Sequence, residues 1–303
     1  MPCALCDFLI RILMFNPVVI LQSMVSGLLM GGIFALFGVG FSLTWGVMKV
    51  INIAHAAFGI LASYIAYWGL TLYGVDPILS LVLSLPLLFI TGLLVHRFLV
   101  QPITRSRDVV VASMILTFGL AIVLENLMLF AWSPDERLIT TPYSSQAIFF
   151  GEIIIKVSNL LGFVLSMVGI AAIYLFLYRT RTGKAVRATW QDPEGAALQG
   201  INLKRVSMIT FGLAIASAGA GGVAMAYMYS FSPPAHNLWL LFLFLVVIVG
   251  GVGSIIGSAI AGLLIGLITG LSGAFFPMEW INVLLFGLLM GILLIKPEGL
   301  FQK

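Results

Sequence analysis

Residues 178–206, YRTRTGKAVRATWQDPEGAALQGINLKRV, form the longest polar interruption in a chain that is otherwise nearly all apolar. The stretch holds six of the 15 lysine and arginine residues of the sequence, together with Asp192 and Glu194. After it, residues 206–278 run for 73 positions without a formally charged side chain. This contrast decides the fold, because uncharged runs of that length are typical of helices that cross a membrane.

The overall composition supports the same interpretation. Of the 303 residues, 61% are hydrophobic and 9% are charged, whereas a soluble domain has about 25% charged residues. The net charge of +4 does not indicate a nucleic-acid partner, because the basic residues fall in short loops between apolar runs. We therefore predict an all-α polytopic membrane protein in which residues 1–303 form one transmembrane domain.

The uncharged intervals predict where the spans lie. A spanning helix needs about 20 apolar residues, which gives about nine spans, with eight and ten as the limits. Ten result if residues 8–15 join a real helix, and eight if the glycine-rich region after residue 250 is re-entrant. The predicted spans are 19–45, 50–75, 77–95, 109–132, 157–178, three helices within 206–278, and 280–295.

The loops set the orientation of these spans. If residues 179–205 are cytoplasmic and the N-terminus is outside, 12 of the 15 basic residues lie inside and six of the 11 acidic residues lie outside. This distribution follows the positive-inside rule. The C-terminus is then expected to be cytoplasmic.

Several glycines recur four residues apart, so they share one face of a helix and allow two backbones to approach closely. They are Gly27 and Gly31; Gly262, Gly266 and Gly270; and Gly287 and Gly291. Their spacing is typical of ordinary helix packing. It is also consistent with helices that slide between two states, and the spacing does not separate these readings.

Three polar residues within the apolar regions are candidates for a substrate path. Asn52 and His55 follow Lys49 at three-residue steps, which would form a polar line on a helix. The alternative is an interfacial helix start, with Lys49 reaching to the surface and Asn52 acting as a cap. Glu125 is the only carboxylate well inside a span. It either lines the path or bonds to Asn126 or a neighbouring helix.

The polar stretch has local structure of its own. Gly183 permits a turn, and Asp192 is a good N-cap for a short helix with Pro193 at its first position and Glu194 in its first turn. Gly200 can end that helix. A capped, alanine-rich helix between basic flanks predicts that a soluble partner docks here. The alternative is a solvated loop whose basic residues merely follow the positive-inside rule.

Signatures of catalysis do not occur in the sequence. No GxxxxGK[ST] phosphate loop, HExxH or GxSxG motif is found, so we expect neither an enzyme nor a metal site. The CxxC pair, Cys3 and Cys6, has no second ligand pair and no strand–helix pattern after it. We interpret it as an incidental N-terminal feature rather than a redox or metal motif.

Several segments taken together resemble the permeases of branched-chain amino-acid ABC transporters, of the LivH/LivM type and closer to LivH. The similarity covers residues 27–301. The segments are GLLMGGIFALFGVGFSLTWGVMKVINIAHAAFG (27–59), QPITRSR (101–107), GLAIVLENLMLF (119–130), GGVGSIIGSAIAGLLIG (250–266) and LLIKPEGLF (293–301). In the polar stretch, the positions similar to that family's cytoplasmic coupling loop are Gly183, Arg187, Asp192, Glu194, Ala197 and Gly200.

The resemblance implies a non-catalytic subunit in a bacterial inner membrane. A second permease would complete the path for the amino acid. A periplasmic or lipid-anchored binding protein would deliver the substrate. Two separate ATPases would bind ATP and Mg²⁺ and dock on the coupling loop, so this chain would bind no cofactor itself.

Two positions depart from the family pattern and leave the substrate open. Ala56 and Ala57 follow His55, where the family usually has glycine and then a polar residue, and Glu125 stands where glutamine is common. The family also includes permeases for urea, amides and other amino acids. Outside the family, the alternatives are an ion-coupled secondary transporter, which predicts an inverted repeat and midplane acids, a scaffold subunit, and a channel. One candidate acid and no clear repeat are visible in the sequence.

Overall fold

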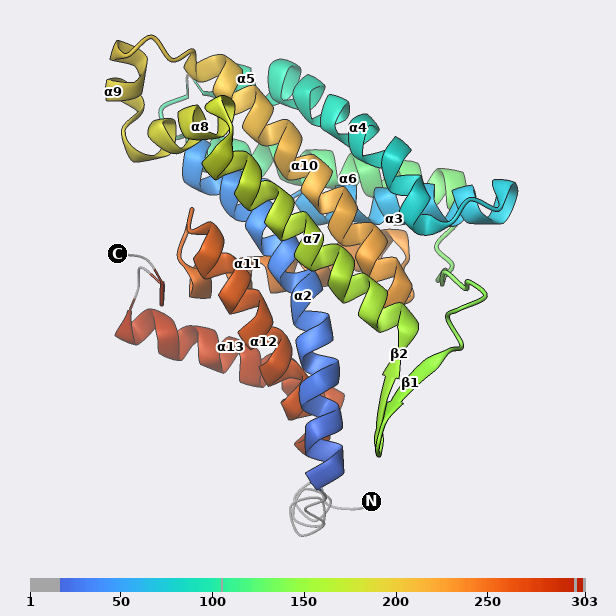
Figure 1. The fold of residues 1–303 in the computed structure, drawn as a ribbon. Coiled ribbons are helices and arrows are strands. Elements are labelled where there is room, and N and C mark those ends of the chain that lie inside the picture. Colours follow the sequence, from blue (N-terminus) through green and yellow to red (C-terminus); the bar gives the residue numbers. More distant parts are fainter. Residues whose placement is uncertain (1–16, 105, 297–298, 302–303) are drawn as a thin grey trace.

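The computed structural model describes residues 17–104, 106–296 and 299–301, and Figure 1 shows that helices make up nearly all of them. Eight helices are long and apolar enough to cross a membrane, and a shorter apolar helix follows them. This confirms an all-α polytopic protein with eight to ten spans. The helices are α2 (Pro17–Met48), α3 (His55–Tyr73), α4 (Pro77–Val95), η1 (His96–Val100), α5 (Gln101–Ile103), α6 (Val109–Trp132), α7 (Val157–Arg179), α8 (Arg181–Gln191), α9 (Pro193–Leu198), α10 (Leu203–Met228), η2 (Pro233–Ala235), α11 (His236–Gly250), α12 (Ile255–Phe275) and α13 (Met278–Ile295).

Most predicted boundaries agree with the structure, and one is wrong. The spans 77–95 and 109–132 match α4 and α6, and residues 206–278 hold three helices as expected. The second span was expected from residue 50, but the backbone is not helical between Met48 and His55. Cys3, Cys6 and residues 8–15 lie outside the described residues.

Helices α2 and α10 form the centre of the bundle. Each is the most buried span in its half of the chain, with 72% and 78% of its most apolar window buried. Helix α2 has 32 residues and is therefore about 48 Å long, against a hydrocarbon core of about 30 Å. It is one continuous helix that exceeds the membrane thickness.

Close backbone contact between α2 and α12 uses the predicted glycines. A Cβ atom on Gly27 would lie 2.6 Å from the carbonyl oxygen of Gly266, and a Cβ on Gly31 would lie 2.9 Å from the Cα of Leu263. Conversely, Cβ atoms on Gly266 and Gly270 would clash with the backbone of α2. The four-residue spacing is therefore a helix-packing device here. Gly287 and Gly291 differ, because nothing lies within 4 Å of a Cβ built on either.

The two halves of the bundle pack in the same way with opposite orientation. Helix α10 lies against α3 and α4, and helix α2 lies against α11 and α12. Five spans, α2, α3, α4, α6 and α7, lie between the start of α2 and the start of α10. Because this number is odd, the two sets run in opposite directions. The set α2–α3–α4–α6 thus corresponds to α10–α11–α12–α13. No clear repeat is visible in the sequence, because an inverted packing pattern does not require similar residues.

A two-stranded hairpin was missed in the polar loop after α6. Strands β1 (Ala147–Phe150) and β2 (Ile153–Lys156) pair antiparallel, with Phe150 opposite Ile153. The side chain of Gln22 on α2 donates to the carbonyl oxygen of Ile154 at 2.9 Å and accepts from its N–H at 2.8 Å. This pair of bonds fixes the hairpin to the N-terminal part of α2. Figure 1 shows the hairpin beside that part of α2, in the lower part of the picture.

Candidate functional site: a buried connection, a Glu–His hydrogen bond and an exposed short helix

Residues 49–54 leave the helical conformation inside the bundle, and side chains of α6 satisfy their backbone. Ser113 Oγ accepts from the N–H of Ile51 at 3.1 Å, and Thr117 Oγ1 accepts from the N–H of Ile53 at 3.0 Å. Thr117 Oγ1 also lies 3.0 Å from the carbonyl oxygen of Ile51, to which it can donate. Non-helical backbone at membrane depth is tolerated only where such partners exist or where it lines an aqueous cavity.

The candidate path residues Asn52 and His55 both lie in this break, and both are completely buried. The predicted helical polar line does not form, because Lys49 and Asn52 are outside any helix and Lys49, at a φ of 54°, is exposed. Asn52 does not cap α3 with its side chain. Neither its amide nitrogen nor its amide oxygen has a hydrogen-bond partner among the described residues. A buried, unpaired amide carries a free-energy cost and commonly marks a functional position.

His55 begins α3 and packs tightly against α2. Its ring meets Phe41 edge-on, with 5.7 Å between the ring centroids. A Cβ atom on Gly40 would lie 3.1 Å from His55 Cε1 and would clash with the hydroxyl of Ser217 on α10. Because Gly40 has no side chain, both His55 and Ser217, which belong to opposite halves of the chain, pack against it.

Glu125 forms a hydrogen bond with a histidine that the sequence did not reveal. Its carboxylate lies 3.0 Å from Nε2 of His236, the first residue of α11. The His236 side chain is 2% exposed and the Glu125 side chain 21% exposed. Asn126 instead donates to the carbonyl oxygen of Ile122 on its own helix. His236 was overlooked because 111 residues separate the partners; the one signal was the Ala-His pair that starts both α3 and α11.

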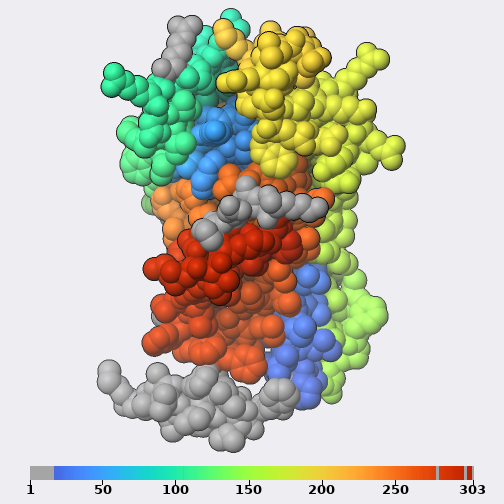
Figure 2. Space-filling model, turned by 90° about the vertical axis from the view of Figure 1, so that its left-hand side faces the viewer, coloured from blue at the N-terminus to red at the C-terminus, as the bar shows by residue number. Residues whose placement is uncertain are grey.

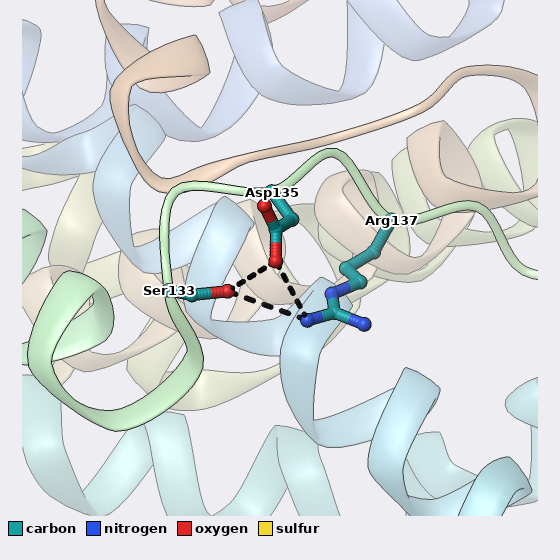
Figure 3. A network of polar contacts seen from close by, with 3 residues as sticks. All are labelled: Ser133, Asp135 and Arg137. Carbon is teal, nitrogen blue, oxygen red and sulfur yellow. Dashed lines mark hydrogen bonds and ion pairs between the residues drawn. The ribbon is translucent and has the colours of Figure 1, made fainter.

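Next to this pair, the loop after α6 is tied to the loop after α10. Asp135 accepts from the hydroxyl of Ser133 at 2.7 Å and forms an ion pair with Arg137 at 3.5 Å (Figure 3). The backbone N–H of Arg137 donates to the carbonyl oxygen of Phe231 at 2.8 Å, and Phe231 returns the same bond. Ser230 donates to Glu136 at 2.9 Å. These contacts hold the start of α11 against the end of α6.

At the opposite end of the spans, the predicted short helix is present as α9. The Oδ1 atom of Asp192 accepts from the N–H groups of Glu194 and Gly195 at 3.1 and 3.0 Å. Gly200, at a φ of 79°, ends the segment in a left-handed conformation. Glu194 and Ala197 are exposed, whereas Ala196 is buried against the rest of the protein. In Figure 2 this segment, in yellow, forms part of the upper end of the molecule.

The segment before α9 is different from the expected turn. It is an eleven-residue helix, α8, with Thr180 as its N-cap. Gly183 lies inside it, and a Cβ there would clash with the backbone at Phe176 and Leu177, so this glycine allows close packing rather than a turn. Arg187 donates to the carbonyl oxygen of Leu177 at 3.1 Å and covers the ring of Tyr178. In the structure, Arg187 holds α8 against α7.

Trp190, at the end of α8, contacts two other parts of the chain. A Cβ on Gly253, in the loop between α11 and α12, would lie 2.7 Å from its indole nitrogen. A Cβ on Gly46, near the end of α2, would lie 3.4 Å from the same atom. Trp190 therefore connects the α8–α9 segment to both halves of the bundle. The sequence signal for this residue was a lone tryptophan in a charged stretch.

The described part of the chain contains no group of three His, Cys, Asp or Glu side chains that could hold a metal ion. The features of this site are contacts between helices and buried polar groups. It has a short exposed helix, contacts of the preceding helix α8 with α2, α7 and the loop before α12, and polar groups at the connections before α3 and α11.

Comparison with known proteins gives a consistent result. Residues 23–294 match the model of a family described as a branched-chain amino acid transport system / permease component. BraD, a high-affinity branched-chain amino acid transport system permease protein of Pseudomonas aeruginosa, is 29% identical over 93% of this chain and 96% of its own. LivH of Escherichia coli strain K12 is 26% identical over the same shares. A probable LivH of Methanocaldococcus jannaschii is 29% identical over 78% of this chain and 75% of its own. No solved structure matches.

Proposed function

Because the chain belongs to the family of permease components of branched-chain amino acid transport systems, we propose that it is the permease subunit of an ABC importer. Its substrates are branched-chain or other hydrophobic amino acids. The observation that carries this proposal is the family match over residues 23–294, which overlaps every predicted span. The chain itself performs no catalysis in this account.

The proposed assembly has four kinds of component. This chain and a second permease subunit form the path, two ATPase subunits bind ATP and Mg²⁺, and a periplasmic or lipid-anchored protein delivers the amino acid. The orientation follows the positive-inside rule, with α8, α9 and the C-terminus in the cytoplasm. The exposed face of α9, with Glu194 and Ala197, is the docking surface for one ATPase.

Coupling requires that movement of α9 reaches the spans. Several contacts support a rigid connection. Asp192 caps α9, Arg187 holds α8 on α7, and Trp190 lies against Gly46 and Gly253. Closure of the ATPases would shift α8 and α9 together. This shift would change the position of α2 relative to α11 and α12. A coupling free energy between the ATPase and substrate sites needs two such arrangements of the bundle.

The proposed substrate path uses the two breaks at the starts of α3 and α11. Asn52 supplies an unpaired amide at the first break, and Glu125 with His236 supplies a hydrogen-bonded pair at the second. Broken helices at matching positions of two inverted halves are a common place for transport sites. In this account Asn52, His55 and Glu125 lie on or beside the path.

The experiment is co-expression of the tagged full chain with ATPase, second permease and binding-protein subunits from its own genome. We expect the ATPases and the second permease to co-purify from membranes. The purified binding protein is expected to bind leucine, isoleucine or valine more tightly than urea or acetamide. Purification of the chain without any ATPase would contradict the assembly. Preferential binding of urea would contradict the substrate and leave the assembly intact.

A further inference from the structure

A pocket of about 460 Å³ lies at the end of the bundle that carries α8 and α9. Its lining comes from two parts of the chain that are far apart in sequence. Arg97, Phe98, Gln101, Pro102 and Thr104 belong to or follow η1 and α5, and Lys204 belongs to the first turn of α10. In Figure 2 the teal-green segment around residue 100 and the start of α10 are at the upper end, beside the yellow segment.

The polar part of this pocket is basic. Arg97 and Lys204 are exposed, and neither forms an ion pair with any residue that the structure describes. Gln101 adds a side-chain amide, whereas the hydroxyl of Thr104 already donates to the carbonyl oxygen of Gln101 at 2.7 Å. No acidic side chain is among the described residues of the lining. Such a site favours a phosphate group.

The surroundings of the pocket are apolar and face outward. Phe98, which lines the pocket, is 65% exposed, and Leu94, one turn earlier on α4, is 50% exposed. Only 28% of the most apolar window of this helical segment is buried inside the protein. Exposed apolar side chains of a span contact lipid or a neighbouring subunit, and we take this surface as the lipid-facing one. A ligand in this pocket therefore meets basic groups on one side and the membrane on the other.

We propose that this pocket binds the phosphodiester headgroup of an anionic glycerophospholipid, with an acyl chain along Phe98 and Leu94. Basic pockets between transmembrane helices on the cytoplasmic side have the required chemistry. The lipid would hold the end of α4 against the start of α10, next to the proposed coupling segment. The side of the membrane follows from the orientation proposed above, but binding itself does not require ATPases.

The test compares Arg97→Gln/Lys204→Gln with a matched double variant, Arg179→Gln/Lys184→Gln, which removes two exposed basic residues from the same end of the bundle. The purified, delipidated full chain is titrated with phosphatidylglycerol or phosphatidylcholine, and bound lipid is counted by native mass spectrometry. We expect the wild type and the control to prefer phosphatidylglycerol. The pocket variant should lose at least about tenfold in affinity for it.

Three results would overturn the proposal. Equal loss of phosphatidylglycerol binding in both double variants would show a diffuse charge effect. Displacement of the lipid by inorganic phosphate at millimolar concentration would assign the site to a soluble phosphate. Unchanged lipid binding together with reduced ATPase co-purification in the pocket variant would assign the surface to the ATPase. The lipid titration uses the permease alone, so its failure is distinguishable from failure of the proposed transport function.

Discussion

The indole of Trp190 lies directly against Gly253, so that a single methyl group on this glycine would come within 2.7 Å of the indole nitrogen. Gly253 also has a φ of 84°, a conformation that side chains with a Cβ rarely adopt. The contact joins the end of α8 to the loop between α11 and α12. It is the most direct link between the proposed ATPase docking segment and the second half of the bundle.

Gly253→Ala is expected to reduce coupling, because the substitution is strained and displaces Trp190. The backbone alone costs on the order of 1–3 kcal/mol. Gly151→Ala is the control, since Gly151 has a φ of 60° in the hairpin turn but nothing within 4 Å of its Cβ position. ATP-driven uptake should fall in the first variant and not in the second. Equal uptake by both variants would show that the contact between Trp190 and Gly253 is not needed for coupling.

Loss of the Asp192 cap should weaken α9. Asp192→Ala removes the acceptor for two backbone N–H groups, which costs about 0.5–2 kcal/mol of helix stability. We expect ATPase co-purification to decrease while membrane insertion is unchanged. Asp108→Ala, which removes the similar cap of α6, is the matched control and should not affect ATPase binding.

Glu194→Lys tests the exposed surface of α9, and Gly200→Trp tests the glycine that ends this segment. Glu194 is exposed, and Gly200 needs its positive φ, so both changes alter the docking face while the spans are untouched. The expected result is a membrane-inserted protein that no longer retains ATPases. Glu152→Lys, an equal charge change on the hairpin, serves as the control. ATPase retention by both α9 variants would place docking elsewhere.

The glycine contact between α2 and α12 is expected to be essential for folding. Gly31→Leu places a large side chain where a Cβ already lies 2.9 Å from the Cα of Leu263. Overpacking in a tight interface costs about 1–3 kcal/mol or more, so the melting temperature in detergent should drop. Gly287→Leu has open space in the described structure and should melt like the wild type. The opposite order of stabilities would argue against this packing.

Breaking the pair between Glu125 and His236 should impair transport more than assembly. Glu125→Ala leaves a buried imidazole nitrogen without its hydrogen-bond partner, and a buried polar group left unpaired costs about 1–3 kcal/mol. Glu125→Gln keeps a hydrogen-bonding group and should retain part of the uptake. Uptake by Glu125→Ala at the wild-type rate, measured in the assembled complex, would favour a purely structural position outside the path.

Local chemistry in the sequence was sufficient to predict several features of this protein. The Asp192 cap and Gly200 end of α9 depend on neighbours within a few residues, as do the starts of α4 and α6 at Pro77 and Val109. Contacts across the bundle could not be predicted in this way. The pairing of Glu125 with His236 and of Trp190 with Gly253 depends on how whole helices pack. Gly183 was misinterpreted because glycine allows both turns and close helix contact, and only tertiary structure distinguishes them.

The break at residues 49–54 was hidden for a similar reason. Its apolar residues fit a helical span, and the change of conformation depends on Ser113 and Thr117 of α6, which are more than 60 residues away. The hairpin β1–β2 likewise depends on Gln22. In each case a side chain from another helix satisfies the backbone in place of a helical hydrogen bond.

Uptake of labelled leucine by proteoliposomes tests the central claim most directly. The vesicles contain the chain alone, or the chain with the second permease and both ATPases, with binding protein and leucine outside and ATP inside. Uptake is expected only in the complete assembly and only with hydrolysable ATP. Uptake by the chain alone, driven by a proton or sodium gradient, would contradict the account and identify an ion-coupled transporter.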